Sequence, residues 1–270
     1  MSKHVLSDPV GDQINEGSKP RICVRDLTVA FGSFVLMSHI SFDVNAGDIF
    51  MIMGGSGCGK STLLRVLMGL KQPAQGLVQY NGRDFWGGTE KTRNELMRDT
   101  GVLFQNGALW SSMTLVENVS LPLQLYTNLD AKAIREYAML KLALAGLAGF
   151  EEYYPSEISG GMRKRAGLAR AMALDPEILF LDEPSAGLDP VSSRLLDDLI
   201  LELRESLGTT FVIVSHELAS IFAIANNGIF LDAQTRTATA HGNPKELVGN
   251  SNTERNAMLF LTRGATEQQP

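Results

Sequence analysis

Hydrophobic residues recur along this chain first as short apolar runs. The stretch ISFDV at 40–44 alternates apolar and polar residues, which is the pattern of a strand with one buried face. Three other runs are apolar without alternation, namely DIFMIM at 48–53, EILFLDE at 177–183 and TFVIVSH at 210–216. Continuous runs of this length, bounded by turn residues, are typical of central strands in a parallel sheet covered on both faces.

Helical stripes alternate with these runs. In KSTLLRVLMGL at 60–70, leucine and valine side chains recur with the spacing that places them on one helical face. A second stripe, also interpreted as core packing, is formed by Ala133, Tyr137, Leu140, Leu144 and Leu147. The alternation indicates an α/β chain with an all-helical insertion at roughly 107–165.

Composition and charge narrow the class of protein. Of the 270 residues, 44% are hydrophobic and the formal net charge is −6, so a sizeable core is expected and broad attraction to nucleic acid is not. The dense cationic run Arg163-Lys164-Arg165 is interpreted as a solvated helix face. No run approaches the roughly 20 apolar residues that span a bilayer, and the polar start lacks the apolar region of a signal peptide. We therefore expect a cytoplasmic protein.

The cysteines and the chain ends complete this outline. Cys23 and Cys58 are too few for a disulfide framework or a zinc site, and each is interpreted as a small buried filler. We expect a flexible tail at 1–20, one domain at 21–242, and a C-terminal helix and tail at 243–270, with GATEQQP at 264–270 as its loose end.

The stretch GGSGCGKST at 54–62 fits the G-x-x-x-x-G-K-[ST] pattern, between a buried strand and an amphipathic helix. Glycines allow the backbone to approach closely and turn its N–H groups toward phosphate oxygens, while the helix N-terminus adds partial positive charge. Lys60 is expected to neutralise the β- and γ-phosphates, and Ser61 to ligate Mg²⁺. The residues expected to hold the nucleotide are Gly54, Gly55, Ser56, Gly57, Cys58, Gly59, Lys60, Ser61 and Thr62.

A second signal is ILFLDEP at 178–184, where two acids follow a buried strand. A carboxylate at the carboxyl end of such a strand emerges where open α/β sheets bind their ligands. Asp182 is expected to hold the hydration shell of Mg²⁺, and Glu183 to orient or deprotonate an attacking water. With the phosphate loop, these residues indicate an enzyme that hydrolyses a magnesium-bound nucleotide.

The order of motifs resembles that of ABC-type ATPases. ISGGMRKR at 158–165, followed by AGLARAMALDPEILFLDEPSAGLDP, is similar to their signature helix, Walker B strand and D-loop. Gln105 resembles their Q-loop glutamine, His216 their switch histidine and Phe31 the aromatic that stacks on adenine. The resemblance implies an α/β fold, a RecA-like P-loop NTPase core with an antiparallel β subdomain and an inserted α-helical subdomain.

The same resemblance implies a head-to-tail homodimer that sandwiches two ATP molecules. Gln105 would join Mg²⁺ and the attacking water to the helical insertion, and His216 would hold the γ-phosphate and the water. The residues implied to reach the partner's nucleotide are Ser159, Gly160, Gly161, Met162 and Asp189. Most ABC signatures carry glutamine where this chain has Met162, so we expect modest effects on affinity and no loss of hydrolysis.

SGGM with its basic residues, together with FQNGALW…MTLVENVSLPL at 104–123, resembles the ATPase subunits of MCE (mammalian cell entry), Mla-type phospholipid transporters. That implies an integral-membrane permease, an MCE-domain protein and a place on the cytoplasmic face of the inner membrane. Leu109, Trp110 and Met113 would line the groove that receives the permease, unless Trp110 packs inside the helical insertion. Two alternatives stay open, the ATPase of an amino-acid or drug transporter and a non-transport ABC ATPase.

Overall fold

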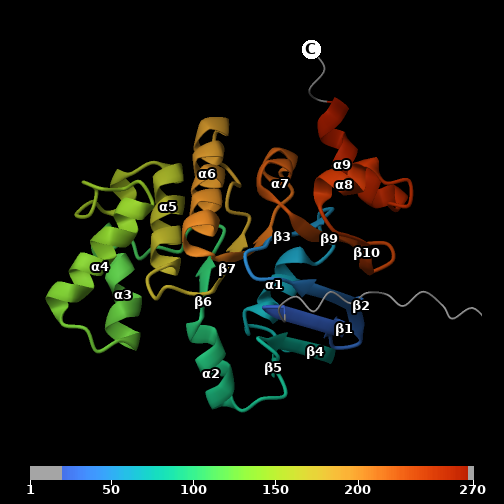
Figure 1. Cartoon of the computed structure of the whole chain (residues 1–270), viewed down its shortest axis with the longest axis horizontal. Coiled ribbons are helices and arrows are strands. Elements are labelled where there is room, and N and C mark those ends of the chain that lie inside the picture. The colour runs from blue at the N-terminus through green and yellow to red at the C-terminus, as the bar shows by residue number, and fades with distance from the viewer. Residues whose placement is uncertain (1–19, 267–270) are drawn as a thin grey trace, which may run out of the picture.

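A six-stranded sheet runs through the middle of the computed structural model, which describes residues 20–266 and side chains as far as Arg263 (Figure 1). Its strand order is β10-β9-β3-β8-β7-β6, with β10 antiparallel at one edge and the other pairs parallel. The strands are β3 (Ile49–Gly54), β6 (Thr100–Leu103), β7 (Ile178–Asp182), β8 (Thr210–Val214), β9 (Asn227–Asp232) and β10 (Thr237–His241). Every residue of β3 and β8 is buried, which confirms the predicted doubly covered parallel sheet.

The two faces of this sheet bury different partners. Met51 and Met53 of β3 join a cluster with the helices that follow β6 and β7, whereas Phe50 and Ile52 join α1 (Lys60–Leu67) and a second sheet. This alternation follows from the period of two in a strand. In α1, Leu63, Val66 and Leu67 are fully buried as predicted, but the helix ends at Leu67 and leaves Leu70 61% exposed.

The second sheet is antiparallel and has the order β2-β1-β4-β5. Residues 40–44 form the end of β2 and alternate in burial as their sequence pattern predicts. The strands are β1 (Ile22–Phe31), β2 (Phe34–Val44), β4 (Gln75–Tyr80) and β5 (Arg83–Asp84). This is the antiparallel β part of the fold, and α2 (Glu90–Arg98) leads from it back to β6.

The chain between β6 and β7 is helical and packs at one end of the sheet (Figure 1). Its elements are α3 (Leu115–Tyr126), α4 (Ala131–Leu144), the short 3-10 turn η1 (Pro155–Glu157) and α5 (Gly160–Ala171). Thr114 caps α3 in a reciprocal capping box with Glu117, and Asp130 caps α4. These polar caps define where each helix begins.

The predicted apolar stripe is wrong within α4, although its last residue, Leu147, is fully buried just beyond that helix. Tyr137, Leu140 and Leu144 are 40–52% exposed. The helix instead buries Ile134, Ala138, Lys141 and Leu142 against α3 and α5. Both faces of α4 carry apolar side chains, and Lys141 can be buried because its ammonium group pairs with Asp175. Periodicity alone could not choose between the two faces.

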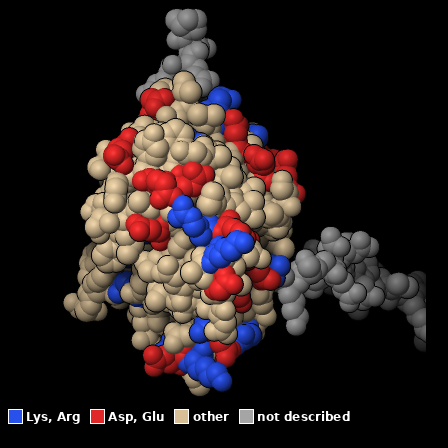
Figure 2. Space-filling view, turned by 90° about the vertical axis from the view of Figure 1, so that its left-hand side faces the viewer, with Lys and Arg blue, Asp and Glu red and all other residues tan. Residues whose placement is uncertain are grey.

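The exposed face of α4 belongs to the side of the molecule that Figure 2 shows. Acidic and basic side chains are mixed there and are separated by wide uncharged areas. None of the helices described between residues 20 and 266 is long and apolar enough to cross a membrane.

Within the described residues, four more helices follow β7, namely α6 (Pro190–Leu207), α7 (Leu218–Ile224), α8 (Pro244–Gly249) and α9 (Arg255–Thr266). α9 packs on β9, the strand next to the edge of the central sheet, where the Phe260 ring lies 5.3 Å from that of Phe230 and Asn256 donates to Asp232. It continues through residues 264–266, for which a loose end is predicted. Of the tails predicted at 1–20 and 264–270, residues 1–19 and 267–270 lie outside the described residues.

One buried acid joins α6 to α7. The Asp197 carboxylate accepts a hydrogen bond from the Ser220 hydroxyl at 2.8 Å, and both residues are less than 9% exposed. Burial raises the pKa of Asp197 to about 6. Because this value lies above the pKa of an unfolded aspartate, about 3.9, the ionised carboxylate destabilises the folded protein at neutral pH.

Asp197→Asn is therefore expected to raise the free energy of unfolding, by up to about 3 kcal/mol at pH 8. The gain should shrink as the pH falls through 6 and vanish near 4, where aspartate is neutral in both states. Urea unfolding of the variant and of the unchanged protein measures the gain in unfolding free energy at pH 8 and at pH 5. Asp198→Asn, at an exposed neighbouring position, is the control and should show little gain at either pH. If Asp197→Asn and the unchanged protein have the same free energy of unfolding at pH 8, the ionised Asp197 carboxylate does not destabilise the fold.

Candidate functional site

A pocket of about 750 Å³ opens where β3 ends and α1 begins. Every residue of the loop 54–62 lines it except Cys58, whose side chain is 5% exposed. Burial raises the pKa of the Cys58 thiol, which suits the predicted role as filler. Cys23 is only half-buried, so it departs from the prediction that both cysteines are buried.

Two glycines give this loop its shape. Gly54 has φ 148°, and a Cβ there would lie 2.5 Å from the carbonyl oxygen of Leu231. Gly59 has φ 100°, and a Cβ there would lie 2.4 Å from Cε of Met37. Any larger residue would strain the backbone or displace its neighbours, so the loop depends on glycine at both positions.

Positive charge and N–H groups converge on the pocket. The Lys60 side chain is 9% exposed, and its ammonium group donates to the carbonyl oxygens of Gly54 at 2.9 Å and Gly55 at 3.0 Å. α1 begins directly at Lys60, and Gly59 before it has no side chain to cap the first N–H groups. Uncapped N–H groups at a helix start, beside an ammonium group, form a site for an anion.

A hydroxyl and a carboxylate meet at the side of the loop. The Ser61 hydroxyl donates to the Asp182 carboxylate at 3.0 Å, which joins the start of α1 to the end of β7. Among the described residues no group of three or more histidine, cysteine, aspartate or glutamate side chains could hold a metal ion. Ser61 and Asp182 nevertheless supply the oxygen atoms that Mg²⁺ prefers, and Gln105 lines the same pocket. The donor set thus fits Mg²⁺ shared with the oxygens of a bound phosphate.

Glu183 and His216 form a second pair at the pocket. Nδ1 of His216 lies 2.8 Å from the Glu183 carboxylate. The Glu183 side chain is 12% exposed, whereas that of His216 is 59% exposed. Glu183 also has φ 50°, a left-handed conformation that is strained for a residue with a side chain and is frequent at functional sites. Its N–H group donates to the carbonyl of Val214 at 2.9 Å.

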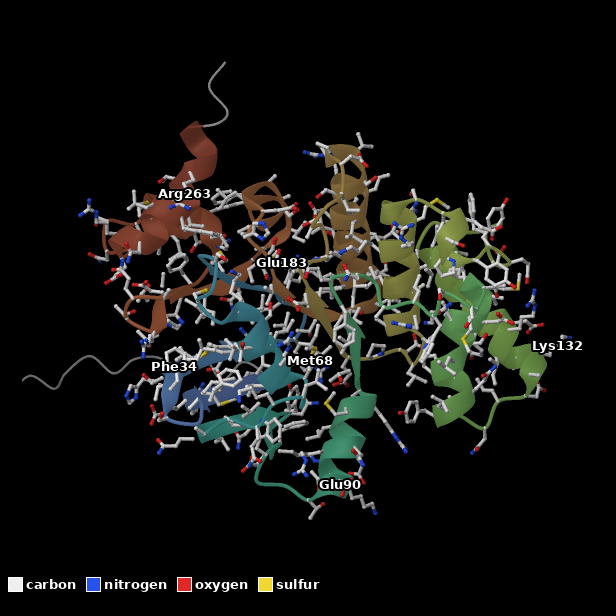
Figure 3. All side chains as sticks on the ribbon, turned by 180° about the vertical axis from the view of Figure 1, so that it is seen from behind. Phe34, Met68, Glu90, Lys132, Glu183 and Arg263 are labelled. Carbon is white, nitrogen blue, oxygen red and sulfur yellow. The ribbon has the colours of Figure 1, made fainter. Side chains whose placement is uncertain are left out.

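The pocket has an aromatic wall and a second wall that the sequence did not predict. Phe31 is 54% exposed, and the Lys71 ammonium group lies 3.9 Å from its ring centre. The unpredicted lining residues are Leu36, Leu218, Phe260 and Arg263. Figure 3 shows Arg263 on the C-terminal helix and Glu183 nearer the centre of the molecule. Phe260 and Arg263 are three positions apart on α9. This spacing places them on one face of the helix, but it does not predict which part of the molecule that face meets.

The signature residues lie elsewhere. Ser159 caps α5 and accepts from the Met162 N–H at 3.2 Å. A Cβ on Gly161 would lie 3.0 Å from Ser192, so packing against α6 explains that glycine. A Cβ on Gly160 would meet nothing closer than 3.8 Å, so nothing described in this chain requires glycine there. Neither these residues nor Asp189 line the described pocket.

Asp189 caps α6, and it accepts from the N–H groups of Val191 and Ser192, both at 3.0 Å. The Ser192 hydroxyl donates to the other carboxylate oxygen at 2.6 Å, and its hydrogen bond lowers the pKa of Asp189. Asp189 is exposed. It therefore has a structural role within the chain besides the predicted contact with a second copy.

The prediction that Arg163, Lys164 and Arg165 form a solvated helix face holds for Arg163, which is exposed, and is wrong for Lys164 and Arg165. Lys164 is 7% exposed and Arg165 is half-buried. Their donors reach main-chain carbonyls instead of water, those of Arg165 reaching Ala145 and Gly146. A run of like charges gave no sign of these internal acceptors.

Comparison with known proteins agrees with this geometry. The ABC transporter family model matches residues 37–186. The chain is 37% identical to "Intermembrane phospholipid transport system ATP-binding protein MlaF" of Escherichia coli K12, over 84% of each chain. It is 42% identical to "Probable ribonucleotide transport ATP-binding protein mkl" of Mycobacterium leprae, over 76% of this chain and 59% of that one. The chain thus spans about three fifths of the length of the mkl relative.

Solved structures share the fold. A dimeric ATP-binding cassette in a post-hydrolysis state, bound to ADP and Pi, has a TM-score of 0.74 at 26% identity, over 82% of this chain and 98% of that one. cbiO1 of Clostridium perfringens, part of the ABC transporter complex cbiONQ, has a TM-score of 0.79 at 25% identity, over 92% and 98%. From its fold, its pocket and these matches, the chain belongs to the ABC transporter family and has the fold of its ATP-binding cassettes.

Proposed function

We propose that this chain binds and hydrolyses ATP as the cytoplasmic subunit of a transporter that moves phospholipid. The observation that carries the proposal is the pocket at the end of β3, where a phosphate-binding loop faces the Glu183–His216 pair. A loop alone would support nucleotide binding. The carboxylate and imidazole beside it add the groups that hydrolysis needs.

ATP binding follows from the groups around the pocket. The Phe31 ring is exposed and can stack on the adenine. Lys60 is held by two carbonyls of the loop, so its charge is already aimed at the site of the β- and γ-phosphates. Ser61 and Asp182 would hold Mg²⁺, with Gln105 beside them, and the ion would neutralise charge on the phosphate oxygens.

In hydrolysis, Glu183 accepts the proton of the attacking water or orients that water toward the γ-phosphate. Its carboxylate is largely shielded from solvent and is held by His216 at 2.8 Å. The exposed His216 ring can hold the γ-phosphate and the water from the open side of the pocket. The backbone of Glu183 is fixed between β7 and β8, so the carboxylate is positioned before substrate binds.

The signature stretch supports a homodimer. The start of α5 is an N-terminus with a serine cap and a glycine at 160 that this chain's own packing does not require. Such a helix start can approach a γ-phosphate closely. The start of α5 does not line the pocket of its own chain. We therefore infer that Ser159, Gly160 and Met162 contact the ATP bound by a second copy, with Asp189 at the interface between the copies.

The transported substrate is inferred from the relatives. The MlaF relatives, named for phospholipid transport, align over 84% of both chains, whereas the mkl relatives, named for ribonucleotide transport, extend well beyond this chain. Because the MlaF relatives align over more of their length, we favour phospholipid as the transported substrate, and ribonucleotide is the second candidate. We further infer an integral-membrane permease and an MCE-domain protein as partners, and a position at the inner membrane through the permease.

The proposed permease contact lies in the segment after Gln105. Trp110 is 58% exposed, so the alternative that it packs inside the helical insertion is wrong. Its N–H and carbonyl groups are both bound by the buried Asn118 side chain, which fixes the loop and presents the ring to solvent. Leu109 and Met113 are half-buried beside it. A rigid loop with an exposed aromatic anchor suits a partner helix.

Glu183→Gln is expected to keep nucleotide affinity within about threefold and to reduce the hydrolysis rate at least a hundredfold, about 2.7 kcal/mol in activation free energy. Glutamine keeps the volume and the contact with His216 but cannot accept the proton. Fluorescent ATP binding and phosphate release measure the two effects. The conservative change Glu177→Gln, just before the opposite end of β7 in an exposed ion pair with Arg21, is the control. Near-normal hydrolysis by Glu183→Gln would show that another group activates the water.

Purification of the tagged chain from membranes tests the transporter and its substrate. We expect it to copurify with a multi-span permease and an MCE-domain protein, and extraction should release phospholipid in excess of a permease-free control. A permease accompanied by a soluble solute-binding protein, with bound ribonucleotide or amino acid and no enriched lipid, would contradict the phospholipid proposal. It would leave the ATPase proposal intact.

A further inference from the structure

Lys164 lies in the second turn of α5 and reaches back into the core of the molecule. It is 7% exposed, and its ammonium group donates to two main-chain carbonyls, those of Gln105 and, at 3.2 Å, Glu183. A buried lysine is costly unless its donors are satisfied, so these two contacts account for its position. Both acceptors belong to residues that line the 750 Å³ pocket.

The contact with Glu183 falls on a strained peptide. Glu183 has φ 50°, and such a conformation costs about 1–3 kcal/mol unless surrounding contacts hold it. Its N–H group donates to Val214 on β8, while its carbonyl accepts from the Ala186 N–H at 3.2 Å and from Lys164. Lys164 is the donor in this set that comes from the helical part of the chain. It therefore joins the conformation of Glu183 to the position of α5.

The contact with Gln105 is part of a longer attachment along α5. Arg170 donates to the carbonyls of Gly107 at 3.1 Å and Ala108 at 2.8 Å. Between them, a Cβ on Gly167 would lie 3.1 Å from the Gly107 carbonyl, so the helix and the segment 105–108 touch along their backbones. This segment cannot move away from α5 without breaking the bond to Lys164 or those to Arg170.

The charges around Lys164 favour its ionised form against the effect of burial. Burial lowers the pKa of Lys164, while the carboxylates of Glu183, Glu217 and Asp182 raise it. The ammonium group thus also offsets negative charge where three acids gather beside a phosphate site. A neutral side chain of similar length would fill the space but supply neither the donors nor the charge.

We propose that Lys164 is a positioning residue for ATP hydrolysis. Its ammonium group fixes the Glu183 peptide and the segment that carries Gln105 to α5, and so holds the Glu183 carboxylate in place beside His216. The proposal rests on the proposed function, because it assigns Glu183 as the group that activates water. Lys164 itself touches neither nucleotide nor water. It acts through the main chain of Gln105 and Glu183, the two residues that do.

The test compares steady-state ATP hydrolysis by the full-length chain and four variants. Lys164→Met removes the donors and keeps the length, Lys164→Arg restores donors, and Glu183→Gln reports the proposed base. Lys141→Met is the matched control, since Lys141 is also a buried lysine of the helical region but pairs with Asp175. Melting temperature and affinity for a fluorescent ATP analogue are measured for each.

Lys164→Met is expected to lower kcat at least tenfold, with KM and analogue affinity changed less than threefold. Lys164→Arg should recover most of the rate, and Lys141→Met should keep kcat within about twofold even where it lowers the melting temperature. If Lys164→Met does not fold, Lys164→Gln, whose uncharged amide group keeps N–H donors, is expected to show an intermediate kcat at unchanged KM.

Two results would overturn the proposal while Glu183→Gln is inactive. One is a Lys164→Met or Lys164→Gln rate within twofold of the unchanged chain. The other is an equal loss of rate in Lys141→Met, which would mark a general effect of destabilising the helical region. Near-normal activity in Glu183→Gln would instead contradict the role of Glu183 in activating water, which belongs to the proposed function and on which this proposal rests.

Discussion

The parallel arrangement of β3, β7 and β8 is the constraint on which the site depends. Parallel neighbours end at the same edge of a sheet, so the loop after β3, the acids after β7 and the histidine after β8 emerge together. Lys60, Asp182 and His216 come from distant parts of the sequence. Their meeting follows from strand pairing and from the complete burial of β3 and β8, which leaves these strands no other register.

The second organising feature is α5, whose N-terminus and second turn lie toward different parts of the molecule. Its N-terminus, with Ser159 as the cap and Gly160 as the first residue, lies away from the pocket of its own chain. Its second turn sends Lys164 to the carbonyls of Gln105 and Glu183, inside that pocket's wall. In the proposed dimer, one helix would thus serve the nucleotide of the partner at one end and the catalytic group of its own chain one turn later.

Much of this could be predicted from the sequence because the relevant signals are local. The phosphate loop needs glycines at fixed positions, and the buried strands beside it read as continuous apolar runs. Gly54 and Glu183 illustrate how such motifs encode backbone geometry, since both occupy conformations that most residues avoid.

The failures share a different cause, the dependence of burial on tertiary partners. The stripe through Tyr137 and Leu140 is as periodic as a core face, but α3 and α5 cover a different face of α4. Lys164 belongs to a run of like charges, and only the folded chain brings carbonyls to it. Phe260 and Arg263 reach the pocket because α9 packs on β9, a contact between elements whose own sequences give no sign of it. Local patterns therefore predict elements and motifs better than they predict which side chains meet.

The central claim is that each ATP site is built from two copies of the chain, and complementation between two inactive variants tests it most directly. Lys60→Ala disables the phosphate loop, and Ser159→Arg disables the signature stretch. The account predicts that each variant alone is inactive, and that mixing them restores hydrolysis, because the mixed dimer has one intact site. A mixture that shows no more than the sum of the separate residual rates, although mixed dimers form, would contradict it.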